Sequence, residues 1–184
     1  MELVVLLPIL AFVALAAGLI MVFRRTNRIV ARTREVEGFR ATVHDLAGRI
    51  EVSLAGATER IDAVRHNALP PAALGDTLTA ATDAVERYVD EAKDLKPPTQ
   101  GRSIRSDLIA DLERAGRALS MVEHGTTIMV NVRRGNRELE GQTSLKRGYL
   151  NLLHARDAIA RHAAAAEDLV AAPADPQDIV SRGA

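Results

Sequence analysis

The chain has 184 residues, no cysteine, and equal numbers of acidic and basic residues, so its formal net charge is zero. The absence of cysteine excludes a disulfide framework and thiol chemistry. A net charge of zero argues against general affinity for nucleic acid, which requires a basic face. Hydrophobic residues make up 47 % of the chain but aromatic residues only 3 %, a composition that favours packed helices over sheets and predicts an all-α fold.

The first element in the chain is an apolar stretch at residues 3–23, which predicts a single transmembrane helix within an anchor of residues 1–25. The stretch holds no charged side chain, and its length as a helix, about 31 Å, matches a hydrocarbon core of about 30 Å. A cleaved signal peptide is the alternative, because Ala14-Leu15-Ala16 imitates a cleavage site. The positive charges follow the apolar stretch rather than precede it, which favours a retained anchor.

Basic residues directly after the apolar stretch indicate its orientation in the membrane. The positive-inside rule places them, and the rest of the chain, in the cytoplasm, with the N-terminus outside the cell membrane. Their side chains are also suited to contact anionic headgroups, so the lipid bilayer is the first expected partner. These membrane-flanking residues are Arg24, Arg25, Arg28, Arg32 and Arg34.

Residues 26–171 are expected to form a helical-bundle domain, which begins with a long helix at about 27–66. Apolar residues recur there at steps of three and four, the spacing that lines one face of a helix. The favoured interpretation is a bundle core, and a parallel homodimeric coiled coil is the alternative. The seam consists of Val36, Phe39, Val43, Leu46, Ile50, Leu54, Ala57, Ile61 and Val64.

Two proline pairs mark the next boundaries. Pro70-Pro71 ends the first helix and Pro97-Pro98 ends the second, because proline removes an amide donor and clashes with the preceding turn. Between the two pairs, a seam from Leu74 to Leu95 predicts the second helix. Six acidic residues against two basic ones give this segment a net charge of −4.

A third seam runs from Ile104 to Leu139 and predicts one long helix that ends near residue 140, with a break at Gly125 as the alternative. Residues 141–144 are then expected to form a turn, with Thr143 or Ser144 as the N-cap of the fourth helix.

The fourth seam, from Leu145 to Val170, completes the predicted domain, and the proline-containing residues 172–184 predict a disordered tail. Lone amphipathic helices must bury their apolar faces. Four of them joined by short turns therefore predict an antiparallel bundle of about four long helices behind the transmembrane helix.

Signatures of catalysis and metal binding are missing from the sequence. No two of the five histidines lie four residues apart, and no glutamate is followed three residues later by a histidine, as the di-iron bundles require. Neither a G-x-S-x-G nor an S-x-x-K motif occurs. We therefore expect no enzyme activity, cofactor or metal.

Five basic residues surround the expected turn between the third and fourth helices: Arg133, Arg134, Arg137, Lys146 and Arg147. With two acidic residues between them, the segment 133–148 carries a net charge of +3. These residues either form solvated surface, neutralise the acidic second helix, or bind an acidic protein partner. Nucleic acid is not expected, because only Phe39, Tyr88 and Tyr149 could stack bases after the anchor.

The layout of an N-terminal anchor followed by long helices is similar to that of the LemA proteins, although the arginine-flanked motifs of that family are not visible. The membrane-proximal helix also resembles the HAMP signalling module, without its proline start and acidic–glycine motif. Both resemblances imply architecture alone. The sequence thus predicts a membrane-tethered interaction or scaffold protein with an unidentified protein partner. A dimeric relay element that signals through the juxtamembrane helix, or an enzyme, is the alternative.

Overall fold

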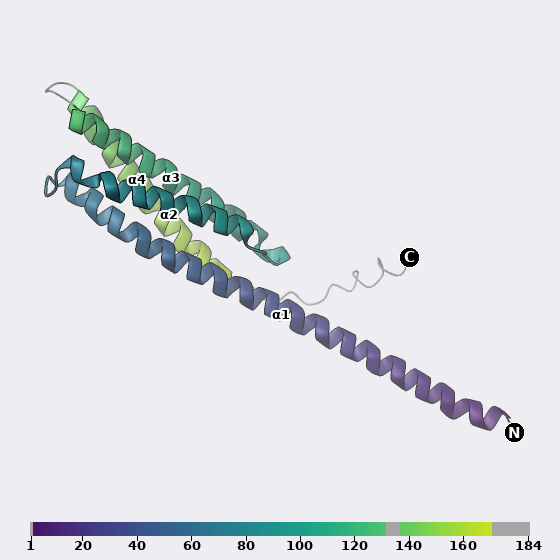
Figure 1. Ribbon diagram of the computed structural model, residues 1–184. Helices are drawn as coiled ribbons and strands as arrows, with labels where there is room; N and C mark the ends of the chain where they lie inside the picture. The colour runs from purple at the N-terminus through teal and green to yellow at the C-terminus, as the bar shows by residue number, and fades with distance from the viewer. Residues whose placement is uncertain (1, 132–136, 171–184) are drawn as a thin grey trace. The chain divides into compact units, whose positions relative to one another are not determined.

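The computed structural model describes residues 2–131 and 137–170, and every regular element in this part of the chain is helical (Figure 1). The α-helices are α1 (Glu2–Arg65), α2 (Gly75–Asp94), α3 (Arg102–Asn131) and α4 (Arg137–Glu167). Two short 3-10 helices, η1 (Pro71–Leu74) and η2 (Thr99–Gly101), precede α2 and α3. The expected all-α fold is confirmed for these residues, and the predicted tail at 172–184 lies outside them.

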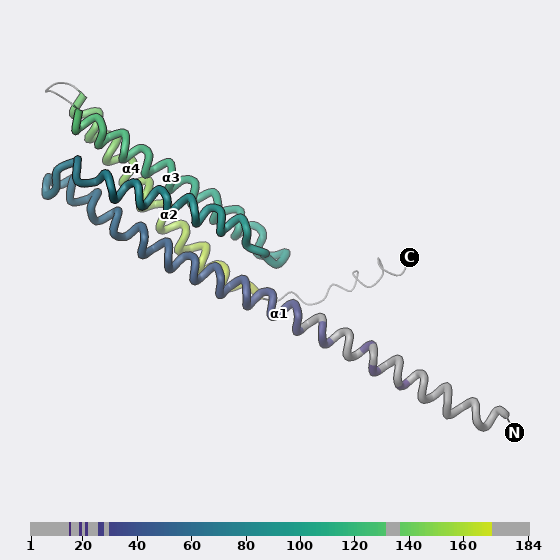
Figure 2. The backbone as a smooth tube through the Cα atoms, in the orientation of Figure 1, coloured from purple at the N-terminus to yellow at the C-terminus, as the bar shows by residue number. Residues whose placement is uncertain are grey.

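The chain divides into two compact units, one of Met1–Glu37 with Val170–Ala184 and the other a bundle of Gly38–Leu169. In the first unit, the described apolar side chains Leu15 and Met21 are exposed. Among the residues whose side chains are described, which are coloured in Figure 2, no helix is long and apolar enough to cross a membrane. Most side chains of the predicted span, residues 3–23, lie outside that set, so the span stays a prediction.

The first predicted boundary of the bundle is confirmed. Helix α1 ends at Arg65, and Asn67 then adopts the left-handed conformation, with φ of 58°. This conformation lets the amide of Ala68 donate to the carbonyl of Ala63 at 2.8 Å, which satisfies one of the last helical carbonyls. Pro70 follows in extended conformation, so the chain turns into η1 and α2.

The third and fourth helices differ from the prediction. Helix α3 ends at Asn131, whereas residues 141–144, the expected turn, lie inside α4. The expected helix to about residue 140 is therefore wrong, and so is the alternative break at Gly125. Leu139, assigned to the third seam, is 68 % exposed on α4. Residues 132–136, where the described helices are joined, lie outside the described residues.

Thr143 and Ser144 are not N-caps. The Thr143 hydroxyl donates to the carbonyl of Leu139 one turn earlier in α4, at 2.7 Å. The Ser144 hydroxyl donates across to α3, to the carbonyl of Met121 at 2.9 Å. Both groups are thus engaged inside or between helices rather than at a helix start.

The four helical segments of the bundle form an antiparallel ring in which each helix lies beside the next and α4 closes on α1. In each neighbouring pair, residue numbers that rise along one helix fall along the other. The contacts that establish this are Arg49–Glu91 and Ser53–Tyr88 for α1 and α2, Arg105–Leu95 and Gly116–Val85 for α2 and α3, Asp111–His162 and Met121–Ser144 for α3 and α4, and His44–Glu167 and Glu51–Arg156 for α4 and α1.

The predicted seams supply one continuous core. Every bundle member of the first seam, from Phe39 to Val64, is buried. Aliphatic side chains from all four helices fill the interior, and burying each one contributes about 1.5–3 kcal/mol. Those with almost no exposed surface include Leu46, Ile50, Leu54, Leu74, Leu108, Leu112, Leu119, Leu145 and Leu152.

Glycines bring the backbones of α3 and α4 into direct contact. A Cβ atom on Gly148 would lie 2.8 Å from the carbonyl oxygen of Ala118 and 2.9 Å from the amide nitrogen of Val122. A Cβ atom on Gly125 would lie 2.7 Å from the carbonyl oxygen of Gly141. Real Cβ atoms do not approach so closely, so these positions require glycine. Gly141 therefore serves helix packing, which explains why it does not mark a turn.

Polar side chains join α4 to α1. Arg156 lies on the fourth seam, where it needs a carboxylate partner, and it binds the carboxylate of Glu51 through two nitrogens. Its third nitrogen donates to the buried hydroxyl of Thr58 at 2.7 Å. Arg40 adds a hydrogen bond to the carbonyl of Leu169. The partnered guanidinium of Arg156 shows how a charge is accommodated on a core-facing position.

Candidate functional site

Three of the five basic residues expected to surround a turn, Arg137, Lys146 and Arg147, lie along the first turns of α4. Arg137 is the first residue of α4, and its Nε atom lies 3.9 Å from Oε2 of Glu140. Lys146 and Arg147 are exposed two to three turns further along the helix. Arg133 and Arg134 lie outside the described residues. The structure thus places three of the five predicted residues on one helix.

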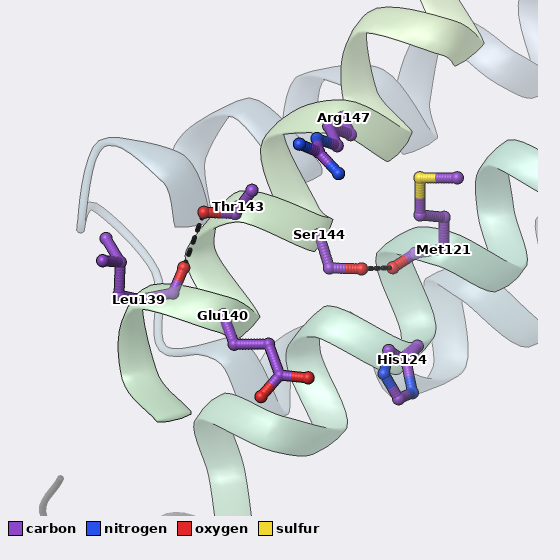
Figure 3. A pocket seen from close by; sticks show the side chains of 7 residues that line it. All are labelled: Met121, His124, Leu139, Glu140, Thr143, Ser144 and Arg147. Atoms are coloured by element: carbon purple, nitrogen blue, oxygen red, sulfur yellow. Dashed lines mark hydrogen bonds between the residues drawn. The ribbon is translucent and has the colours of Figure 1, made fainter. Parts of the chain in front are cut away.

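A cleft of about 610 Å³ opens between α3 and α4 at this end of the bundle. Its lining combines two apolar side chains with charged and hydroxyl-bearing ones, as Figure 3 shows. Met121 and His124 come from α3, and Leu139, Glu140, Thr143, Ser144 and Arg147 come from α4. Arg147 is therefore the predicted partner-binding residue that the structure places in a concave site.

Two of the polar side chains in the cleft are engaged with the backbone. Both of the cleft's hydroxyl groups donate to backbone carbonyls, as the dashed lines in Figure 3 show. The guanidinium of Arg147 lies on one side of Ser144, and the side chains of Glu140 and His124 lie on the other (Figure 3). The cleft can therefore offer a cation and apolar contact to a ligand, whereas its hydroxyl groups are already engaged with the backbone.

The acidic helix α2 has its own cationic partners. Glu91 binds Arg49 of α1, and Asp90 lies 3.2 Å from Lys93 on α2 itself. The hydrogen bond with Glu91 raises the pKa of Arg49, and burial opposes this only in part. Among the ion pairs of the described residues, none joins α2 to Lys146 or Arg147.

Three of the described histidines, His44, His66 and His162, each lie beside a single carboxylate. His162 of α4 lies 2.8 Å from the buried carboxylate of Asp111, which also binds Arg114 on its own helix. His44 lies 3.1 Å from Glu167 on the bundle surface. Across the part of the chain that the structure describes, no group of three or more potential ligands could hold a metal ion. The Asp111–His162 pair was not predicted, because its members are 51 residues apart.

The membrane-flanking arginines belong to the N-terminal part of α1. Arg34 is exposed and Arg32 is half-buried. The side chains of Arg24, Arg25 and Arg28 lie outside the described set. Their expected contacts with lipid headgroups therefore stay a prediction.

Comparison of the chain with protein-family models, with curated proteins and with solved structures finds no match.

Proposed function

We propose that this protein is a membrane-tethered helical interaction module that presents its bundle to protein partners in the cytoplasm. The observation that carries the proposal is the self-contained core. Val43 and Ile50, on the face that a coiled-coil dimer would use, have at most 1 % of their surface exposed within a single chain. A bundle that satisfies its own apolar faces provides a stable surface for partners.

The tether is supported by the sequence of the N-terminal unit. Residues 3–23 contain no charge, and five arginines follow within eleven residues. An uncharged run of this length satisfies its backbone hydrogen bonds inside one helix, as lipid requires, and the basic flank favours a cytoplasmic bundle.

The relay alternative needs a homodimer along the first seam. Because Val43 and Ile50 are buried against the other helices of the same chain, such a dimer would first have to open the bundle. That would expose the apolar core to water, so the relay function ranks below the interaction module.

Carbonate extraction and thiol labelling test the tether and its orientation. The chain has no native cysteine, so Thr99→Cys, in the exposed connection before α3, introduces a single reporter thiol. The protein should remain in carbonate-washed membranes, and Thr99→Cys should react with an impermeant maleimide only after the cells are permeabilised. A Glu2→Cys control should react in intact cells. Release by carbonate, or a mature N-terminus near Ala17, would refute the tether, and the reverse labelling pattern would refute the orientation.

A further inference from the structure

The cleft between α3 and α4 offers an exposed apolar surface beside cations. Leu139 is 68 % exposed, and Met121, its apolar counterpart on α3, is partly buried. Methionine side chains adapt to differently shaped apolar groups, and for this reason they are common on peptide-binding surfaces. Each of these two residues can contact an aliphatic or aromatic side chain of a ligand.

Arg147 lines the cleft and Lys146 precedes it on α4, and both cations are available to an incoming ligand. Lys146 and Arg147 are exposed, and neither is part of an ion pair among the described residues. Glu140, the carboxylate in the lining, faces Arg137 at 3.9 Å. The sequence segment 133–148 as a whole carries a charge of +3. A ligand with carboxylates is therefore favoured over a basic one.

We propose that this cleft binds an acidic segment of another protein, with apolar side chains of the segment at Met121 and Leu139 and its carboxylates at Arg147 and Lys146. This inference rests on the proposed function, since it names the partner of an interaction module. Short segments with one buried anchor and a charged rim are a common mode of peptide recognition.

The cleft lies at one end of the bundle. The bundle begins at Gly38, and the neighbouring Phe39 contacts Gly101 at the start of α3. The cleft lies toward the other end of α3, near Asn131, and at the beginning of α4. The cleft and the first residues of the bundle are therefore at opposite ends of the bundle.

Fluorescence anisotropy with the full chain in phosphatidylcholine nanodiscs tests the inference. The probe is a fluorescein-labelled peptide, Asp-Glu-Leu-Asp-Asp-Leu-Glu-Asp, and its matched control carries Asn and Gln in place of Asp and Glu. We expect saturable binding of the acidic peptide, weakened by added salt. The double variant Lys146→Gln/Arg147→Gln should bind about tenfold more weakly, since each charge contact contributes modestly at an exposed site.

Two control variants separate the cleft from general electrostatics. Arg87→Gln/Arg102→Gln removes the same charge from exposed positions on α2 and α3 and should change binding by less than about twofold. Leu139→Ser should weaken binding several-fold, whereas Val52→Ser, at a 77 % exposed position on α1, should not. Thermal melting of each variant confirms that the bundle remains folded.

Several results would overturn the inference: no binding, equal binding of the neutral peptide, equal loss in both charge variants, or no effect of Leu139→Ser. Flotation with phosphatidylserine vesicles that depends on Lys146 and Arg147, together with unchanged peptide binding, would assign the surface to lipid instead. None of these results depends on carbonate extraction. Failure of the cleft and failure of the membrane tether can therefore be told apart.

Discussion

Substituting alanine for glycine should have opposite effects at two helical positions of this bundle. At Gly148, a Cβ atom would lie 2.6 Å from Cγ2 of Val122 and within 2.9 Å of two backbone atoms of α3. The Val122 side chain could rotate away, but the backbone atoms could move only if the helices separated. At the exposed Gly56 of α1, nothing lies within 4 Å of the same position.

The magnitudes follow from two known effects. Alanine stabilises a helix by about 1 kcal/mol relative to glycine, and this gain applies at both positions. Overpacking costs about 1–3 kcal/mol, and it applies only at Gly148. Gly56→Ala should therefore gain up to about 1 kcal/mol, and Gly148→Ala should lose up to about 2 kcal/mol. The difference between the two changes in stability is the steric cost of about 1–3 kcal/mol. It corresponds to roughly 2–12 °C in melting temperature for a domain of this size.

Thermal unfolding of the full chain in nanodiscs, followed by far-ultraviolet circular dichroism, measures both variants under one condition. Gly125→Ala provides a second test of the contact, because its Cβ atom would lie 2.7 Å from Gly141 O and from Leu145 N. If Gly148→Ala and Gly125→Ala both melt at or above the wild-type temperature, the backbones of α3 and α4 are not in contact and the packing described above is wrong.

Two further predictions concern the polar contacts and the core. The effects of Arg156→Ala and Glu51→Ala on the free energy of unfolding should be non-additive in a double-mutant cycle, with a coupling of about 1 kcal/mol for a partly exposed pair. Additive effects would show that the pair contributes nothing to stability. Leu112→Asp should unfold the bundle, because this fully buried position would hold an unpaired charge at a cost of several kcal/mol. Leu139 is exposed, so Leu139→Asp should change the free energy of unfolding by less than about 0.5 kcal/mol. Equal melting of both aspartate variants would contradict the burial assigned to them.

Hydrophobic periodicity predicted the core of the first two helices well. The spacing of Phe39, Val43 and Leu46 leaves one continuous apolar face, and proline pairs mark where the chain must turn. The partner of Arg156 could be predicted only as a carboxylate. Glu51 lies 105 residues away in sequence, and periodicity along a helix contains no information about which helices become neighbours.

The connection between α3 and α4 could not be placed, because glycine has two roles that the sequence does not separate. Gly141 permits a turn, and it also permits close approach of two helices. In the structure, Gly141 permits the close approach of α3 and α4. The sequence feature that could have indicated this role is the seven-residue spacing between Gly141 and Gly148. Because of the same error, Lys146 and Arg147 were expected at the start of the fourth helix, whereas they lie two to three turns inside α4. The cleft beside Arg147 depends on both helices and could not be foreseen.

The junction of α1 with α4 joins the two helices of the bundle that are farthest apart in the chain. The other three neighbouring pairs are consecutive in the chain, so they form with low contact order. Pairing Arg156 with Glu51 instead closes a loop of 105 residues, and its entropic cost delays the contact until the other helices have assembled. Interactions absent from the folding transition state act on the unfolding rate. We therefore expect the polar junction of α1 and α4 to affect the rate at which the bundle opens more than the rate at which it assembles.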